Sequence, residues 1–106
     1  MVTKEFAIKT ASALVNDLKM NGAAVEKAFL FGSISREMQH EYSDIDIAIA
    51  GGSFTGVIPV DVKKYISVFS KDEYILIEPH TFSSKGFNEQ DMFVKKIIET
   101  GIELKV

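Results

Sequence analysis

Two aspartates stand one residue apart in a segment that otherwise predicts a buried β-strand. In SDIDIAIA, strand alternation places Asp44 and Asp46 on one face and the isoleucines on the other. Aspartate is disfavoured in strands, and two on one face repel each other unless a positive charge lies between them. Their Cα atoms would lie roughly 7 Å apart, so both carboxylates could bind one or two Mg²⁺ ions. The alternative is a solvated strand face with Asp44 as a turn residue.

The residues before these aspartates predict an anion-binding turn. An apolar strand leads into Gly32 and Ser33, and a short helix is expected over 33–38, so backbone N–H groups and the Ser33 hydroxyl would meet at one point. Arg36, the single arginine of the chain, could reach the same anion. Gly32 and Ser33 are also what an ordinary strand-to-helix turn needs. Combined with a metal-binding strand, the turn predicts a nucleoside triphosphate with Mg²⁺ as the ligand.

Glu78 is the third acidic candidate. It follows the apolar run YILI and directly precedes Pro79, where an unpaired carboxylate would be costly if buried. A role in the site therefore competes with a solvated strand end. Of the two histidines, His40 lies in a polar segment and His80 follows Pro79. We interpret both as solvated or as local hydrogen bonders, although His80 is placed to line a site near Glu78.

A small sheet covered by helices would position these side chains. Hydrophobic spacing predicts alternating helices and strands, with Gly, Asn and Pro at their ends. We expect helices over 4–20, 33–38, 59–69 and 88–101, and strands over 25–31, 45–50, 72–79 and 102–106. Asn88 is the expected N-cap of the last long helix, and Pro79 should stop the third strand. This order indicates the α/β (α+β) class, with a small mixed β-sheet flanked by helices.

Length and composition restrict the functional classes. The chain has 106 residues, 46% hydrophobic and 25% charged, which is typical of one soluble globular domain over residues 1–106. A net charge of -3 argues against a nucleic-acid partner, and no apolar run is long enough for a membrane span. The lack of cysteine excludes disulfides, thiolate zinc sites and cysteine nucleophiles. With no signal-peptide pattern, we expect a cytoplasmic protein.

The stretch LFGSISREMQHEYSDIDIAIA resembles the signature of the minimal nucleotidyltransferases of the DNA polymerase β-like superfamily, in which a G-S turn precedes a D-x-D strand. The resemblance extends over nearly the whole chain, and IEPH and FNEQDMFVKKIIETGIEL are similar to the tail of one bacterial and archaeal group. It implies the nucleotidyltransferase fold and the transfer of a nucleoside monophosphate, AMP from ATP, to a hydroxyl group with Mg²⁺.

The same resemblance assigns roles to individual residues. It implies that Gly32 and Ser33 bind the triphosphate and that Asp44 and Asp46 are the first two metal ligands. Glu78 takes the place of the third acid, which is usually an aspartate on a later strand. We therefore expect Asp44, Asp46 and Glu78 to converge in one cleft beside Gly32 and Ser33.

The resemblance also implies a partner. Similar proteins are often encoded beside a small helical HEPN-type protein and act as the antitoxin of a toxin–antitoxin pair, some by adenylylating that partner. Since the core and the triphosphate site account for the chain, we expect the partner to supply the acceptor hydroxyl. A catalytically weak or inactive antitoxin that only binds its partner is the alternative. It is favoured by Glu37, where members often have glycine, and by Glu78, a glutamate at the position of the third acid. The oligomeric state stays open, a homo-oligomer included.

Overall fold

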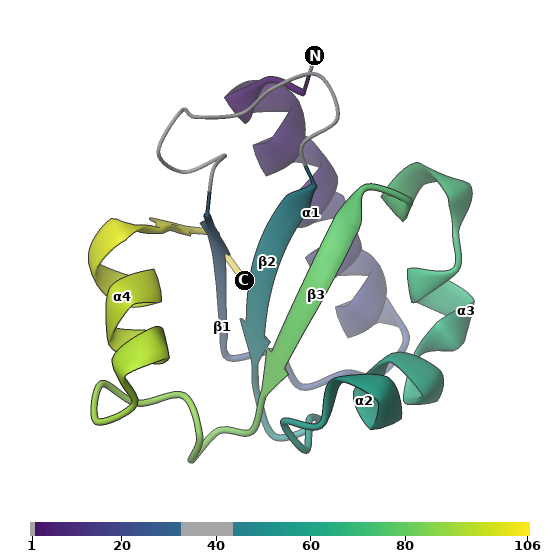
Figure 1. The fold of residues 1–106 in the computed structure, drawn as a ribbon. Coiled ribbons are helices and arrows are strands. Elements are labelled where there is room, and N and C mark those ends of the chain that lie inside the picture. Colours follow the sequence, from purple (N-terminus) through teal and green to yellow (C-terminus); the bar gives the residue numbers. More distant parts are fainter. Residues whose placement is uncertain (1, 33–43) are drawn as a thin grey trace.

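The computed structural model describes residues 2–32 and 44–106 (Figure 1). Four strands form one sheet in the order β3-β2-β1-β4. Strand β1 is antiparallel to both β2 and β4, whereas β2 and β3 are parallel, so the sheet is mixed as expected. The strands are β1 (Lys27–Phe31), β2 (Ile45–Ala50), β3 (Ile77–Phe82) and β4 (Ile102–Glu103).

Helices pack on both faces of this sheet (Figure 1). Helix α1 (Lys4–Met20) and the short α3 (Ile66–Phe69) join one face in the larger apolar core. On the other face, α4 (Met92–Thr100) packs Ile97 against aromatic residues of β1. Helix α2 (Ile58–Lys64) precedes α3. No helix in the two described ranges is both long enough and apolar enough to cross a membrane.

Strand β2 shows the alternation that the sequence predicted. Ile45, Ile47 and Ile49 are fully buried in the core beneath α1. Asp46 and Ala48 consequently point to the opposite face, which α4 covers only in part. Burial of the isoleucines determines which face of β2 carries the aspartate, because a shift of one residue would place three apolar side chains outside the core.

Strand β3 differs from its expected bounds, because it starts at Ile77 and continues through Pro79 to Phe82. Residues Asp72–Tyr74 form a 3-10 turn instead. The parallel ladder begins with Ile45 N–H donating to the Leu76 carbonyl and closes with Gly51 N–H donating to the Phe82 carbonyl. In this pattern the backbone nitrogen of Pro79 faces away from β2, at the open edge of the sheet, where its missing N–H costs no ladder bond.

Some helix ends lie where the sequence predicts them, and others do not. Helix α1 has the predicted bounds, with Thr3 as its N-cap. The helix expected over 59–69 is two helices separated at Tyr65, whose buried ring packs against Phe54.

The N-cap of α4 is Asp91 and not Asn88. The Asp91 carboxylate accepts hydrogen bonds from the Phe93 and Val94 N–H groups, whereas Asn88 caps a local turn by accepting from the Gln90 N–H. The helix ends at Gly101 as predicted.

A charged side chain is completely buried on the helix-covered side of β3. Asp61 of α2 accepts hydrogen bonds from the N–H and hydroxyl of Thr55, the N–H of Gly56 and the hydroxyl of Thr81. Burial by itself raises the pKa of Asp61, but these hydrogen bonds outweigh it and leave the pKa below its ordinary value. Asp61 therefore ties the loop before α2 to the end of β3.

Candidate functional site

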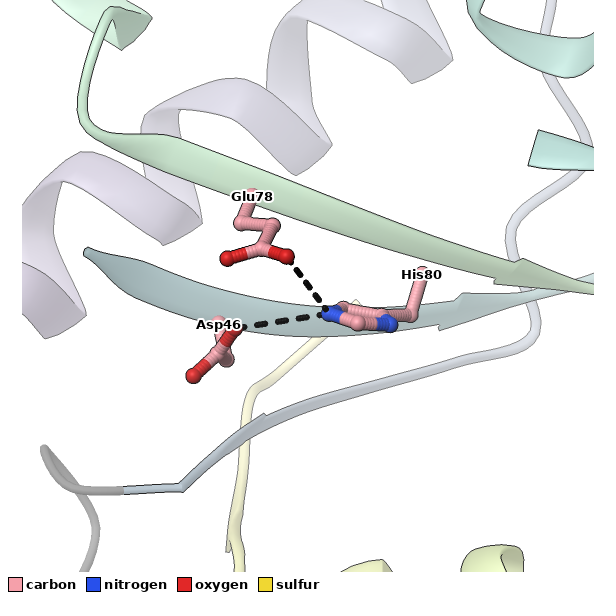
Figure 2. Close-up of side chains that lie close together, drawn as sticks. All are labelled: Asp46, Glu78 and His80. Carbon is pink, nitrogen blue, oxygen red and sulfur yellow. Dashed lines mark hydrogen bonds and ion pairs between the residues drawn. The ribbon is translucent and has the colours of Figure 1, made fainter. Parts of the chain in front are cut away.

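Three side chains capable of binding a metal meet on the face of the sheet opposite the larger core: Asp46 of β2 with Glu78 and His80 of β3 (Figure 2). In the parallel register Asp46 lies opposite Glu78, and Ala48 lies opposite His80. Because alternate residues of a strand share a face, all three side chains project in one direction.

The imidazole of His80 points between the two carboxylates (Figure 2). Its Nε2 lies 3.3 Å from Asp46 Oδ1 and 3.9 Å from Glu78 Oε1. One ligand atom from each residue lies within 4.8 Å of the other two. The side chains of His80 and Asp46 are 22% and 25% exposed, and that of Glu78 is 55% exposed. The group is thus open to solvent on the Glu78 side, where a charged ligand could enter.

Aromatic residues on the other side hold the imidazole in place. The ring of Phe31 meets the His80 ring edge to face at a centroid distance of 4.9 Å, and Phe93 of α4 meets it at 6.1 Å. Phe31 and Phe93 also contact each other at 5.6 Å. Packing of this kind restricts the ring to an orientation in which Nε2 faces the acids.

Gly32 lies directly against the Asp46 carboxylate. Its φ of +77° is one that side chains rarely adopt, and a Cβ built on it would lie 2.6 Å from Asp46 Oδ2. Glycine is therefore required here both for the backbone conformation and for the space beside Asp46. This contact places the start of the predicted anion turn next to the carboxylate pair.

The structure brings together only some of the predicted site residues. Asp46, Glu78 and Gly32 converge, whereas Asp44 is exposed one position before β2 and does not belong to the described group of three. Ser33 and Arg36 lie outside the described residues, as do the predicted helix over 33–38, Glu37 and His40. Their roles stay predictions.

His80 joins the group although the sequence did not place it among the predicted metal ligands. The sequence predicts a solvated or locally hydrogen-bonded His80 near Glu78, but it also ends the strand at Pro79, so a shared face of Glu78 and His80 does not follow from it. Once β3 continues through Pro79, Glu78 and His80 share a face by simple alternation. A glutamate and a histidine two residues apart were the available signal.

A small cavity adjoins the group. Its volume is about 270 Å³, and Phe31, Gly32, Phe93 and Ile97 form most of its lining. Lys96 and Thr100 of α4 add polar groups to the same lining. Since Gly32 and the two aromatic residues also border the carboxylate group, a ligand bound at Asp46 could extend into this space.

Comparison with known proteins identifies the fold. The family model described as polymerase β, nucleotidyltransferase matches residues 13–105. A structure from Sulfolobus solfataricus, described as that of a candidate nucleotidyltransferase, superposes with a TM-score of 0.64 at 19% identity, covering 94% of this chain and 80% of the other. A toxin–antitoxin structure with AMP-PNP superposes with a TM-score of 0.56 at 22% identity, covering 89% and 72%.

A comparison with curated proteins finds no significant match. The family match covers most of the chain, and the solved structures share its mixed sheet and helices. Both findings agree with the resemblance read from the G-S turn and the D-x-D strand. The chain belongs to the polymerase β nucleotidyltransferase family.

Proposed function

We propose that the protein transfers AMP from ATP to a hydroxyl group at the site formed by Asp46, Glu78 and Gly32, with a divalent metal ion. The observation that carries the proposal is the paired register of Asp46 and Glu78 beside Gly32. Two carboxylates on adjacent strands, next to a backbone that approaches without a side chain, suit a nucleotide with its metal. Membership of the nucleotidyltransferase family supports this assignment.

The donor set fits a divalent metal. Asp46 and Glu78 offer carboxylate oxygens, and the space beside Asp46 Oδ2 would be filled by any Cβ at position 32. A metal ion bound there neutralises phosphate charge and lowers the pKa of an attacking hydroxyl. We assign Asp44 to the same metal-binding function from its place in the D-x-D strand.

The transfer itself needs positioning and charge and no covalent nucleophile. Backbone N–H groups at Gly32 and Ser33, with Arg36, would hold the triphosphate. The acceptor oxygen bonds to the α-phosphorus, the bond from that phosphorus to the bridging oxygen breaks, and pyrophosphate leaves. Glu78, the most exposed acid of the group, takes the proton of the hydroxyl.

The cavity beside Gly32 would receive another part of the nucleotide. Lys96 lines it and supplies a positive charge that could pair with a phosphate. Its neighbour Lys95 instead lies 4.0 Å from Glu99 on α4, in an exposed ion pair. Of these two lysines, Lys96 is therefore the one that we assign to nucleotide binding.

The acceptor is proposed to belong to a partner protein of the HEPN type, in the cytoplasm, with this chain acting as a single catalytic domain. The similarity to a toxin–antitoxin structure with AMP-PNP supports a nucleotide and a partner. Met92 and Phe93 on α4 are exposed apolar side chains, and Phe93 borders the site. A partner that covers this part of α4 could bring its hydroxyl to Asp46.

Transfer of radioactive α-phosphate tests the proposal. The wild-type chain with its partner and α-labelled ATP should place label on the partner, and Asp46→Asn should place none, because the amide loses the metal-binding charge. Asp72→Asn is the matched control, since Asp72 is exposed in the 3-10 turn and should leave labelling unchanged. Equal labelling by Asp46→Asn and the wild type would contradict the proposal.

A partner-binding antitoxin without chemistry is the second candidate. The contact of His80 Nε2 with Asp46 favours it, because an imidazole that remains paired with this carboxylate would compete with a metal ion. In that case Asp46→Asn should neutralise the partner as well as the wild type does, and neither chain should carry label. Label on the partner would exclude this candidate.

A further inference from the structure

We infer that His80 is a nitrogen ligand of the metal site and makes the site select first-row transition ions, Mn²⁺ and Co²⁺ among them, over Mg²⁺. The inference rests on the proposed function, because it concerns the same metal site at Asp46 and Glu78. It differs from the all-acid site that the sequence predicted, because the third converging donor is an imidazole.

The geometry suits coordination by three donors. Ligand atoms around such ions lie up to about 4.4 Å apart, since each bond is about 2.0–2.2 Å long. The donor atoms of Asp46, Glu78 and His80 already lie within 4.8 Å of one another. Nε2 faces the acids while Phe31 and Phe93 hold the ring, so small side-chain movements would complete the arrangement.

Charge also favours a dication at this point. Across the described part of the chain, His80 is the only ion-pair partner recorded for Asp46 and Glu78. Even a protonated imidazole would leave the two carboxylates with one uncompensated negative charge. Its Nε2 approaches Asp46 within hydrogen-bond distance but lies 3.9 Å from Glu78, too far for a second hydrogen bond. A metal ion would satisfy all three groups at once.

The nitrogen donor determines which ion is preferred. Mg²⁺ takes oxygen ligands and retains several waters, whereas imidazole is a common ligand of transition metals. Affinity for a mixed nitrogen and oxygen site rises along the first transition row from Mn²⁺. His80 should therefore increase the affinity for Mn²⁺ and Co²⁺ more than the affinity for Mg²⁺.

Direct metal binding to the full chain, without nucleotide, tests the inference. Mn²⁺ binding is measured by electron paramagnetic resonance, Co²⁺ binding by visible absorption, and Mg²⁺ binding by competition with each. His80→Gln replaces the nitrogen donor by an amide. Loss of a residue that only hydrogen-bonds to a metal ligand lowers metal affinity by roughly 10–100-fold, so loss of the ligand itself should lower the affinity for Mn²⁺ and Co²⁺ by at least as much. Its effect on Mg²⁺ should be smaller.

Two further variants separate coordination from packing. His80→Phe keeps an aromatic ring against Phe31 and Phe93 but removes the ligand, so it should lose the preference as His80→Gln does. His40→Asn removes the only other histidine of the chain and should retain the wild-type preference. Pulsed electron paramagnetic resonance of Mn²⁺ bound to the wild type should detect coupling to the imidazole nitrogen. This measurement does not depend on the folding of any variant.

Equal affinity of the wild type for Mn²⁺ and Mg²⁺, or bound Mn²⁺ without nitrogen coupling, would overturn the inference. The inference would also be overturned if His40→Asn lost the preference for Mn²⁺ and Co²⁺ over Mg²⁺ and His80→Gln retained it. Label transfer with Mg²⁺ in a protein that lacks nitrogen coupling would leave the proposed function standing. Selective Mn²⁺ binding with no label transfer under any metal would instead contradict the proposed AMP transfer and support His80 as a metal ligand.

Discussion

Asp61 and Asp46 are two aspartates close to the same sheet, and their surroundings are opposite. Asp61 is completely buried, and both of its oxygens accept hydrogen bonds from neutral donors. Asp46 is partly exposed and faces Glu78 and His80. A carboxylate saturated by fixed donors stabilises the fold and has little capacity left for a ligand. A carboxylate beside another acid retains that capacity and repels its neighbour until a cation arrives.

The largest loss of stability should follow substitution of Asp61, whereas substitution of Asp46 should have a small effect. Asp61→Ala leaves the buried Thr81 hydroxyl without its acceptor, which costs about 1–3 kcal/mol, and removes the part-buried bonds from Thr55 and Gly56, so we expect a loss of about 3 kcal/mol. Asp46→Ala should change the free energy of unfolding by about 1 kcal/mol or less, because Asp46 is partly exposed and its contact with His80 is a single polar interaction. Urea unfolding of both variants measures the difference, and similar losses would show that the two regions do not differ as described.

The next effect separates backbone strain from loss of the site. Gly32→Ala and Gly22→Ala both place a side chain at positive φ, which costs about 1–2 kcal/mol. Only at Gly32 does the added Cβ collide with Asp46, since nothing lies within 4 Å at Gly22. Both variants should lose stability in thermal unfolding, but only Gly32→Ala should lose labelling of the partner. Full labelling by Gly32→Ala would remove Gly32 from the site.

Acid should unfold the protein partly through Asp61. Its folded pKa lies below the ordinary value of 3.8, so the stabilisation is present above that value and is lost as the pH falls through the lower folded pKa. Asp61→Asn carries no ionisable group there, and its stability should fall less steeply below about pH 4 than that of the wild type. Chemical denaturation at several pH values checks the slope. Parallel curves would mean that Asp61 does not ionise with folding.

The smallest effect concerns the edge of the open site. Lys96→Ala should weaken ATP binding by about two- to fivefold, as expected for a solvent-exposed ion pair worth less than ~1 kcal/mol. Lys95→Ala removes the same charge from the same helix, beside Glu99 and away from the cavity at Gly32, and should have no such effect. Calorimetric titration with ATP compares them. Equal losses would indicate a general effect of the charge of α4.

Local sequence signals determined the predictions that are confirmed. The isoleucines of β2 define its inner face, and Thr3 and Gly101 define helix ends, because each signal acts within a few residues. The parallel register that sets Asp46 opposite Glu78 depends on a distant segment and was not available from sequence. Asn88 and Asp91 are both able N-caps, so residue type alone could not decide between them. The roles of Ser33, Arg36 and Asp44 stay predictions.

Pro79 has a consequence for assembly of the protein. At the open edge of β3 it presents no N–H, so an incoming extended segment would find an interrupted row of donors between Ile77 and Thr81. The opposite edge strand, β4, is only two residues long. Neither edge is a good template for adding a strand from another chain, which protects the sheet against edge-to-edge aggregation. A partner should therefore dock through side chains and helices and not by extending the sheet.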